Sequence, residues 1–230
     1  MPVKFPEPIW IKQIYDYKVE WHEIPRLHAP YFRMPESTRL GGLHTTEGST
    51  VESAINALEH GLKAGTPPDP CHLICGENRI IQTRPIGVQA ASMRDPANRR
   101  LTVQIENVGF SKTSGWSLID STRKPLIATL AYCAEHFDIP LTVPLDFPDD
   151  CSDMKGEIWA KFSNSRRNKM QKIWDTATGW ILHLEAPWNH RWDCGAIDRT
   201  QVLKAAADML AQASPALAAD STGGASGEVV

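Results

Sequence analysis

Two segments far apart in the sequence contain the residue types that bind metal ions. The segment HLEAPWNHRWDCGAID, at 183–198, has two histidines with acidic residues after them, among them His190 and Asp193. The segment GGLHTTEG, at 41–48, contributes His44. Imidazole nitrogens and carboxylate oxygens are common zinc ligands. The pattern therefore raises the hypothesis that the two segments meet at a metal site.

A carboxylate lies inside a third segment, LTVQIENVGF at 101–110, which is predicted to be a strand. Its alternation puts Val103 and Ile105 on one face and Glu106 on the other. A carboxylate in the middle of a strand is costly to bury unless it is paired. Glu106 is therefore either on the solvated face of an edge strand or a buried general base beside the metal.

The surrounding pattern predicts the elements that would position these residues. LGGLHTT predicts a buried strand that ends at His44, followed by a helix through Leu62. CHLICGENRIIQTRP predicts a two-stranded hairpin. Apolar spacing over 123–138 predicts another helix, and a last helix begins at Thr200 and runs to about Leu210. Alternating strands and helices with one hairpin predict an α/β domain on a mixed central β-sheet flanked by helices.

The domain boundaries follow from the same pattern. Residues 1–37 are proline-rich and are expected to be an irregular lead-in, 38–210 form the single domain, and 211–230 are a flexible tail. Within the domain, 147–178 is polar and poorly periodic, so it is expected to be a long loop with one short helix. His44 falls where a strand ends, and ligands of α/β sheets gather at strand ends.

Composition limits the function. The 230 residues, 42% of them hydrophobic, can bury one core. A net charge of −3 argues against binding to nucleic acid or to an anionic membrane. There is no run of about 20 apolar residues and no signal-peptide pattern, so we expect no stable membrane association and a chain that stays in the cytosol where it is made. We also expect a monomer. The five cysteines are odd in number and fit a reducing compartment.

Taken in order, these segments resemble a known family. GGLHTTEG, CHLIC, RIIQTRPIGVQAASMRD, LTVQIENVGF and APWNHRWDCGAID are similar to the amidase domain of lysin A endolysins from phages of actinobacteria, over residues 20–205. These enzymes are zinc-dependent N-acetylmuramoyl-L-alanine amidases, a group (amidase type 2) that also contains peptidoglycan recognition proteins. The resemblance implies an amidase-like α/β fold. It also implies a phage endolysin that hydrolyses bacterial peptidoglycan and stays in the host cytoplasm until it is released to the cell wall.

The resemblance also implies roles for particular residues. Zn²⁺ would polarise the amide carbonyl between N-acetylmuramic acid and L-alanine and would activate water, with His44 as first ligand and Glu106 as the base. The family pattern approximates PxNxHxDPG near the second and third ligands. Here Arg191 stands at the position of that histidine, and a guanidinium has no lone pair to offer a cation.

Three alternatives follow from this departure. In the favoured one, His190 takes the vacant position and the metal ligands are His44, His190 and Asp193. In the second, Asp198 or the Cys194 thiolate completes the site. In the third, Arg191 closes the site, and the chain is a catalytically inactive peptidoglycan-binding module on the same fold.

The remaining candidates would contact substrate. The hydroxyls of Thr45 and Thr46 adjoin His44, and aromatic faces such as those of tryptophan suit the apolar sides of sugar rings. Two further histidines match histidine-bearing positions of the family. The residues expected to line the cleft are Thr45, Thr46, His72, Trp180, His183, Trp188 and Trp192.

Overall fold

The computed structural model describes residues 8–24, 38–63, 70–93, 97–110, 119–144, 163–186 and 197–220. Its elements are listed here in chain order with their bounds. They are β1 (Gln13–Ile14), β2 (Tyr17–Trp21), β3 (Leu40–Thr45), α1 (Val51–Lys63), β4 (Leu73–Gly76), β5 (Arg79–Gln82), η1 (Ala97–Arg100), β6 (Val103–Asn107), α2 (Asp120–Phe137), α4 (Asn164–Thr176), β7 (Gly179–Leu182), η3 (His183–Glu185) and α5 (Arg199–Asp220).

One mixed sheet organises the described part of the chain. Its seven strands lie in the order β1-β2-β5-β4-β6-β3-β7. The neighbours β4, β6, β3 and β7 are parallel, whereas β5 runs antiparallel to β4 as the predicted hairpin. The fold class is therefore the predicted one, a single α/β domain with a mixed central sheet flanked by helices.

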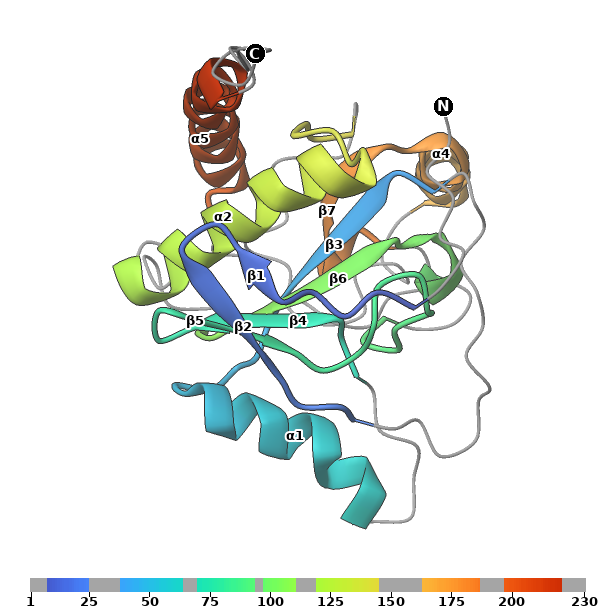
Figure 1. Cartoon of the computed structure of the whole chain (residues 1–230). Helices are drawn as coiled ribbons and strands as arrows, with labels where there is room; N and C mark the ends of the chain where they lie inside the picture. Colours follow the sequence, from blue (N-terminus) through green and yellow to red (C-terminus); the bar gives the residue numbers. More distant parts are fainter. Residues whose placement is uncertain are drawn as a thin grey trace, which may run out of the picture.

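Helices cover the two faces of the sheet unequally. Figure 1 shows α2 and α5 above the sheet and α1 below it, under the β4–β5 side. The larger hydrophobic core lies between the sheet and α2, with Leu43, Ile105 and Leu126 among its buried members. A smaller cluster around Val51 and Val108 packs α1 against the opposite face. His44 and Glu106 point to the face opposite Leu43 and Ile105. The short helix η1 packs on this face too, because the Gln104 side chain on β6 donates to Asn98.

Two adjacent glycines in β3, Gly41 and Gly42, face opposite sides of the sheet. A Cβ atom on Gly41 would lie 2.4 Å from the indole of Trp180, which is fully buried in the larger core. Trp180 therefore packs inside the domain and does not line a cleft, which corrects the expectation from sequence. Gly42 points to the other face, where Met93 and Leu101 approach it.

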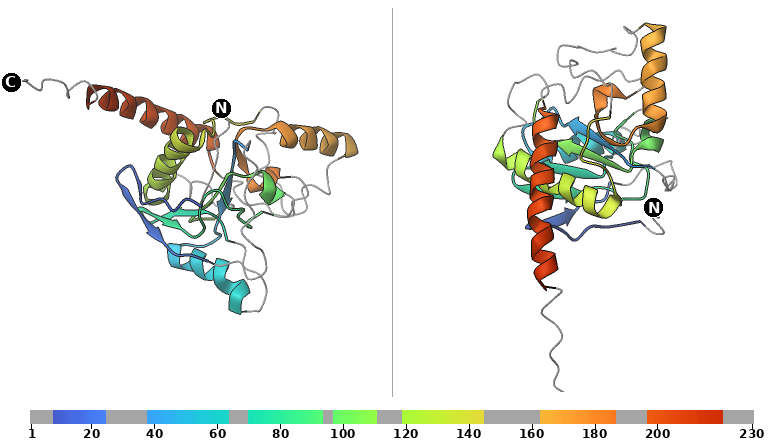
Figure 2. Two further views of the ribbon diagram at one scale, coloured as in Figure 1. Left: turned by 45° about the vertical axis from the view of Figure 1, so that its right-hand side comes forward. Right: turned by 90° about the horizontal axis from the view of Figure 1, so that it is seen from above.

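The sequence misplaced several boundaries. Residues 13–21 were expected to be irregular but form β1 and β2 and extend the sheet. Within β2, YKVEW, the buried valine lies between exposed neighbours, and no proline falls within residues 13–21. The strand β7 was not predicted, since four residues give too little periodicity. Within the expected loop, α4 is a full helix of 13 residues. The last helix does not stop at Leu210 but continues to Asp220 through alanine-rich sequence, and Figure 2 shows it projecting from the body.

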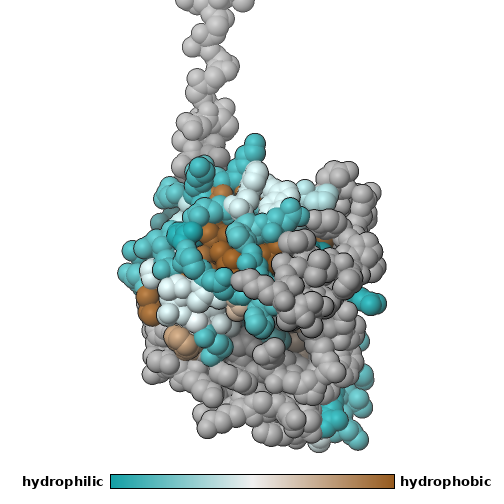
Figure 3. Space-filling view, turned by 90° about the horizontal axis from the view of Figure 1, so that it is seen from below, coloured by the Kyte–Doolittle hydropathy of each residue, from teal (hydrophilic) through white to brown (hydrophobic). Residues whose placement is uncertain are grey.

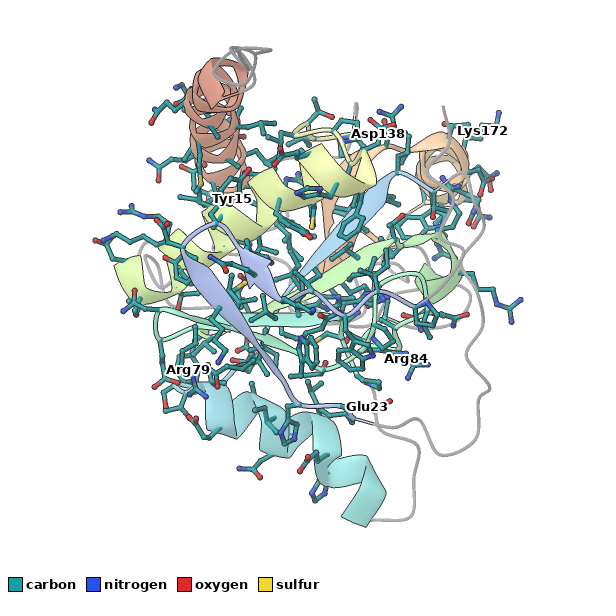
Figure 4. The ribbon with its side chains drawn as sticks, viewed as in Figure 1. Tyr15, Glu23, Arg79, Arg84, Asp138 and Lys172 are labelled. Carbon is teal, nitrogen blue, oxygen red and sulfur yellow. The ribbon has the colours of Figure 1, made fainter. Side chains whose placement is uncertain are left out.

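Polar interactions fasten the outer elements to the sheet. Arg79 on β5, labelled in Figure 4, bonds both Glu20 of β2, at 2.9 Å, and Glu52 of α1, at 2.6 Å. The hydroxyl of Tyr15 donates to Glu135 of α2, and burial together with this carboxylate raises the pKa of Tyr15 to about 12. Seen from below, the described surface is mostly hydrophilic around a small hydrophobic area (Figure 3). None of the described helices is both long and apolar enough to cross a membrane.

Candidate active site

Strand register brings His44 and Glu106 together. In the parallel β3–β6 pair, His44 lies directly opposite Glu106, so both side chains leave the same face at the same level. All five residues of β6 are buried, and the strand is central, with β4 on one side and β3 on the other. Glu106 is therefore not on the solvated face of an edge strand.

Strand β7 adds a second histidine from the other side of β3. Leu43 pairs with Leu182, which places His183 one residue further on, at the same end of the sheet as His44. The Nδ1 atoms of the two histidines are 3.0 Å apart, and their ring centroids are 4.5 Å apart at an angle of 64°. His44 Nδ1 lies 3.9 Å from a carboxylate oxygen of Glu106. All three side chains are buried or nearly so.

The spacing of the two imidazoles fits a shared tetrahedral cation. Zinc–nitrogen bonds of 2.0–2.1 Å with tetrahedral angles place two ligand nitrogens about 3.3 Å apart. The observed separation of 3.0 Å between the His44 and His183 Nδ1 atoms is close to this value. Without a cation, one of the two rings must donate its proton to the other. Imidazole nitrogen is a preferred zinc ligand, so the two rings are candidates for two of the ligands, with the Glu106 carboxylate beside them.

The backbone that carries His44 is fixed by its neighbours on β6. The side-chain amide of Asn107 donates to the His44 carbonyl at 3.0 Å, and the Thr46 amide donates to the Asn107 carbonyl at the same distance. Asn107 is fully buried. This side chain, which sequence reasoning passed over, therefore adds a bond to the end of the β3–β6 ladder, and the Thr46 amide carries the backbone ladder one residue beyond β3.

The two predicted threonines shape the loop after β3. The Thr45 hydroxyl donates to the Glu47 carboxylate at 2.8 Å, and Thr45 itself is buried. The Thr46 hydroxyl accepts from the amides of Gly48 and Gly109, which also form a β-bridge. The Thr46 hydroxyl thus joins the ends of β3 and β6, and the Thr45 hydroxyl stays within the loop after β3. The predicted contact of both hydroxyls with substrate stays a prediction.

His72 lies in the interior of the described part of the domain. It is fully buried, its Nδ1 accepts from the Gln104 amide at 2.9 Å, and its Nε2 lies 2.7 Å from the Val88 carbonyl. The ring is therefore neutral with the proton on Nε2, and burial lowers its pKa to about 3. This placement argues against the expected contact with substrate and makes His72 a link between β6 and the segment around Val88.

The other predicted site residues fall outside the described residues. These are His190 and Asp193, the expected metal ligands, and Trp188 and Trp192, expected beside the cleft, together with Arg191 and Cys194. Asp198 is described, and its carboxylate accepts from the Gln201 amide at the start of α5. Among the described residues, no group of three or more His, Cys, Asp or Glu side chains is arranged to hold a metal.

His183 is the residue whose position sequence reasoning underrated. A signal was present, because His183 ends the apolar run GWIL much as His44 ends LGGL. Each histidine stands at the end of a short apolar run, so in parallel strands both imidazoles would lie at the same end of the sheet. The length of GWIL, four residues, concealed this pattern.

Comparison with known proteins agrees with the architecture. No family model and no curated protein matches the sequence. Among solved structures, Staphylococcus aureus hydrolase AmiA in complex with its ligand is similar over 90% of this chain and 95% of its own, with 11% identity and a TM-score of 0.54. The chain has an amidase-like fold.

Other structural neighbours are amidases, endolysins and PGRPs. The Ph2119 endolysin from a Thermus scotoductus bacteriophage aligns with 82% of this chain and 99% of its own at 16% identity, with a TM-score of 0.46. The N-acetylmuramoyl-L-alanine amidase LysC from Clostridium intestinale aligns with 53% of this chain and 77% of its own at 16% identity, with a TM-score of 0.42. At these identities the likeness concerns the fold, and the chemistry has to be argued from the site.

Proposed function

We propose that this chain is a zinc-dependent peptidoglycan amidase that cleaves the amide between N-acetylmuramic acid and L-alanine, and that it serves as a phage endolysin. The observation that carries the proposal is the meeting of His44, His183 and Glu106 at one end of three neighbouring strands in an amidase-like fold. Bacterial peptidoglycan is the proposed partner. Retention in the host cytoplasm until release to the wall belongs to the same proposal.

The proposed metal ligands are His44, His183 and Asp193. His183 takes the place that sequence reasoning gave to His190, because His183 lies 3.0 Å from His44 while its strand is paired with β3. Asp193 is kept as third ligand from the family pattern. A bound zinc ion would supply a Lewis acid for the amide carbonyl and a water that loses its proton readily at neutral pH.

The protein side chains have separate tasks in this reaction. In this proposal Glu106, whose carboxylate lies 3.9 Å from His44 Nδ1, takes the proton of the attacking water on a carboxylate oxygen and returns it to the leaving amine. Asn107 fixes the His44 backbone, so the imidazole is oriented before substrate arrives. Because Glu106 and both histidines are buried, bulk water competes little for the proton that is moved.

Metal content and activity of matched variants test the proposal. Zinc would be measured by inductively coupled plasma mass spectrometry in wild type, His44→Ala, His183→Ala and His190→Ala, beside release of L-alanine-terminated peptides from peptidoglycan. We expect near-stoichiometric zinc in wild type and His190→Ala, and loss of zinc and activity in the other two. Glu106→Gln should keep zinc and lose at least 100-fold in rate, within the usual range for general-base catalysis.

The opposite outcomes identify the alternatives. Loss of zinc in His190→Ala but not in His183→Ala would restore His190 as the ligand and overturn our assignment. Wild type without zinc and without cleavage, but retained on insoluble peptidoglycan, would make the chain a binding module on the same fold.

A further inference from the structure

His183 lies where a sheet is least able to fix a side chain. It directly follows β7, which is four residues long and is the outermost described strand on its side of the sheet. One edge of β7 pairs with β3, and the other edge meets no described strand. Peptide groups on an unpaired edge need other partners, and short edge strands fray readily. Something else must hold the end of β7 if His183 is to keep a fixed position.

A buried ion pair occupies that outer edge. Arg199, the first residue of α5, bonds Glu185 of η3 in a two-pronged arrangement, at 2.6 Å from Nη1 to Oε2 and 2.9 Å from Nη2 to Oε1. The side chains are 6% and 1% exposed. The arginine joins α5 to the turn that begins with His183.

Both members of the pair also bond the backbone of β7. Arg199 Nη1 donates to the Trp180 carbonyl at 3.1 Å, and Glu185 Oε2 accepts from the Leu182 amide at 2.9 Å. The Trp180 amide donates to the Thr142 carbonyl. The amide and carbonyl of Trp180 and the amide of Leu182 are thereby satisfied, two of these three groups by the ion pair in place of a neighbouring strand.

Packing alone does not explain this arrangement. A buried ion pair gains little stability over apolar side chains of similar volume, because desolvation offsets the attraction between the charges. An apolar pair, however, could not bond Trp180 and Leu182. The feature that distinguishes the Glu185–Arg199 pair is therefore its control of the β7 backbone next to His183.

We infer that the Glu185–Arg199 pair is a positioning device that sets His183 opposite His44 for metal binding, an inference that rests on the proposed function. Neither side chain is one of the proposed metal ligands. The pair acts through the backbone of β7 and η3, where Ala186 also closes the turn by donating to the His183 carbonyl at 3.1 Å. Through Arg199, the start of α5 becomes part of the structure that supports the site.

The test compares zinc affinity with the stability of the metal-free protein. Arg199→Lys keeps the charge and loses the planar fork, and Glu185→Gln keeps the shape and loses the charge. The control is Arg100→Lys, because Arg100 also donates to backbone carbonyls, those of Trp174 and Ala177, before β7 begins. Zinc dissociation constants would come from competition with a chromogenic chelator, at a temperature where circular dichroism shows every metal-free variant to be folded.

We expect Arg199→Lys and Glu185→Gln to weaken zinc binding about 10-fold or more, the lower end of the effect of removing groups that orient a ligand. Arg100→Lys should change it less than 2-fold even if it lowers stability. Amide hydrogen exchange of Leu182 should quicken in the first two variants without zinc and stay unchanged in the control. If Arg199→Lys does not fold, the double variant Glu185→Gln/Arg199→Gln, which leaves no orphaned charge, replaces it with the same expectation.

Wild-type zinc affinity in folded Arg199→Lys would overturn the inference. So would equal weakening in Arg100→Lys, because that would mark a general loss of stability. A wild-type protein that binds no zinc overturns the proposed function instead. In that case, unchanged exchange at Leu182 in Arg199→Lys would separately refute the role of the pair in holding β7.

Discussion

At the scale of the residue, surroundings decide what each histidine can do. The ring of His72 uses both nitrogens on backbone groups, so it has no lone pair or proton left for chemistry. The rings of His44 and His183 turn one nitrogen each toward the other inside the protein. His22 bonds Glu59 near the surface. Sequence alone shows only the histidines, and their roles follow from what the fold places around them.

The buried, neutral His72 predicts a loss of stability in acid. The folded-state pKa of His72, about 3, lies below the unfolded value of about 6.5. Between these two pH values the unfolded chain therefore binds a proton on this ring and the folded chain does not. The stabilisation is complete above about pH 6.5 and is lost as pH falls from there toward 3. Over this range the free energy of unfolding falls by at most about 1.4 kcal/mol for each pH unit.

Denaturant unfolding of metal-free wild type and His72→Gln at pH 7.5 and pH 5 measures this effect. The variant should be less stable at pH 7.5, because it breaks a buried pair of hydrogen bonds, but its unfolding free energy should fall less between the two pH values. Equal pH dependence of both proteins would show that His72 does not titrate as its burial requires.

At the scale of the element, two neighbouring glycines in β3 predict different costs of adding one methyl group. In Gly41→Ala the new Cβ would meet the rigid indole of Trp180 at 2.4 Å. In Gly42→Ala it would meet the flexible end of Met93 at 2.7 Å, which can move aside. We expect Gly41→Ala to lower the free energy of unfolding by about 1–3 kcal/mol, and Gly42→Ala by less.

Chemical denaturation of the two variants beside wild type provides the comparison, and each serves as control for the other. The reverse order of stabilities would contradict the packing of Trp180 against β3. The near-ultraviolet circular dichroism of Gly41→Ala should also change, because the indole has to leave its site.

The elements that sequence predicted well are those with a long or regular pattern. The strand of Glu106, the hairpin and α2 were expected near their observed bounds, because alternation and helical spacing extend over enough residues to be read. Strand β7 was missed because four residues carry no period, and its place beside β3 depends on contacts 139 residues apart in sequence. The meeting of His44 with His183 could not be predicted without that pairing.

At the scale of the whole molecule, the candidate site joins strands from distant parts of the chain. His44 and Glu106 come from the middle of the sheet, and His183 comes from its edge, where α5 supports it through Arg199. No short segment of the chain contains this arrangement, so it exists only in the folded state. Any ligand that bridges the two histidines must therefore stabilise the fold as a whole.

This linkage predicts the effect of zinc on thermal unfolding. A metal that binds only the native state stabilises it by about 2.7 kcal/mol at a free concentration 100 times its dissociation constant. For a domain of this size, each kcal/mol raises the midpoint by roughly 2–4 °C, so zinc should raise it by roughly 5–10 °C, and a chelator should reverse the rise.

Magnesium, which prefers oxygen ligands, should have little effect. His183→Ala should show no rise with zinc, because one imidazole alone cannot bridge β3 and β7; a rise equal to that of wild type would place the stabilising metal elsewhere on the chain.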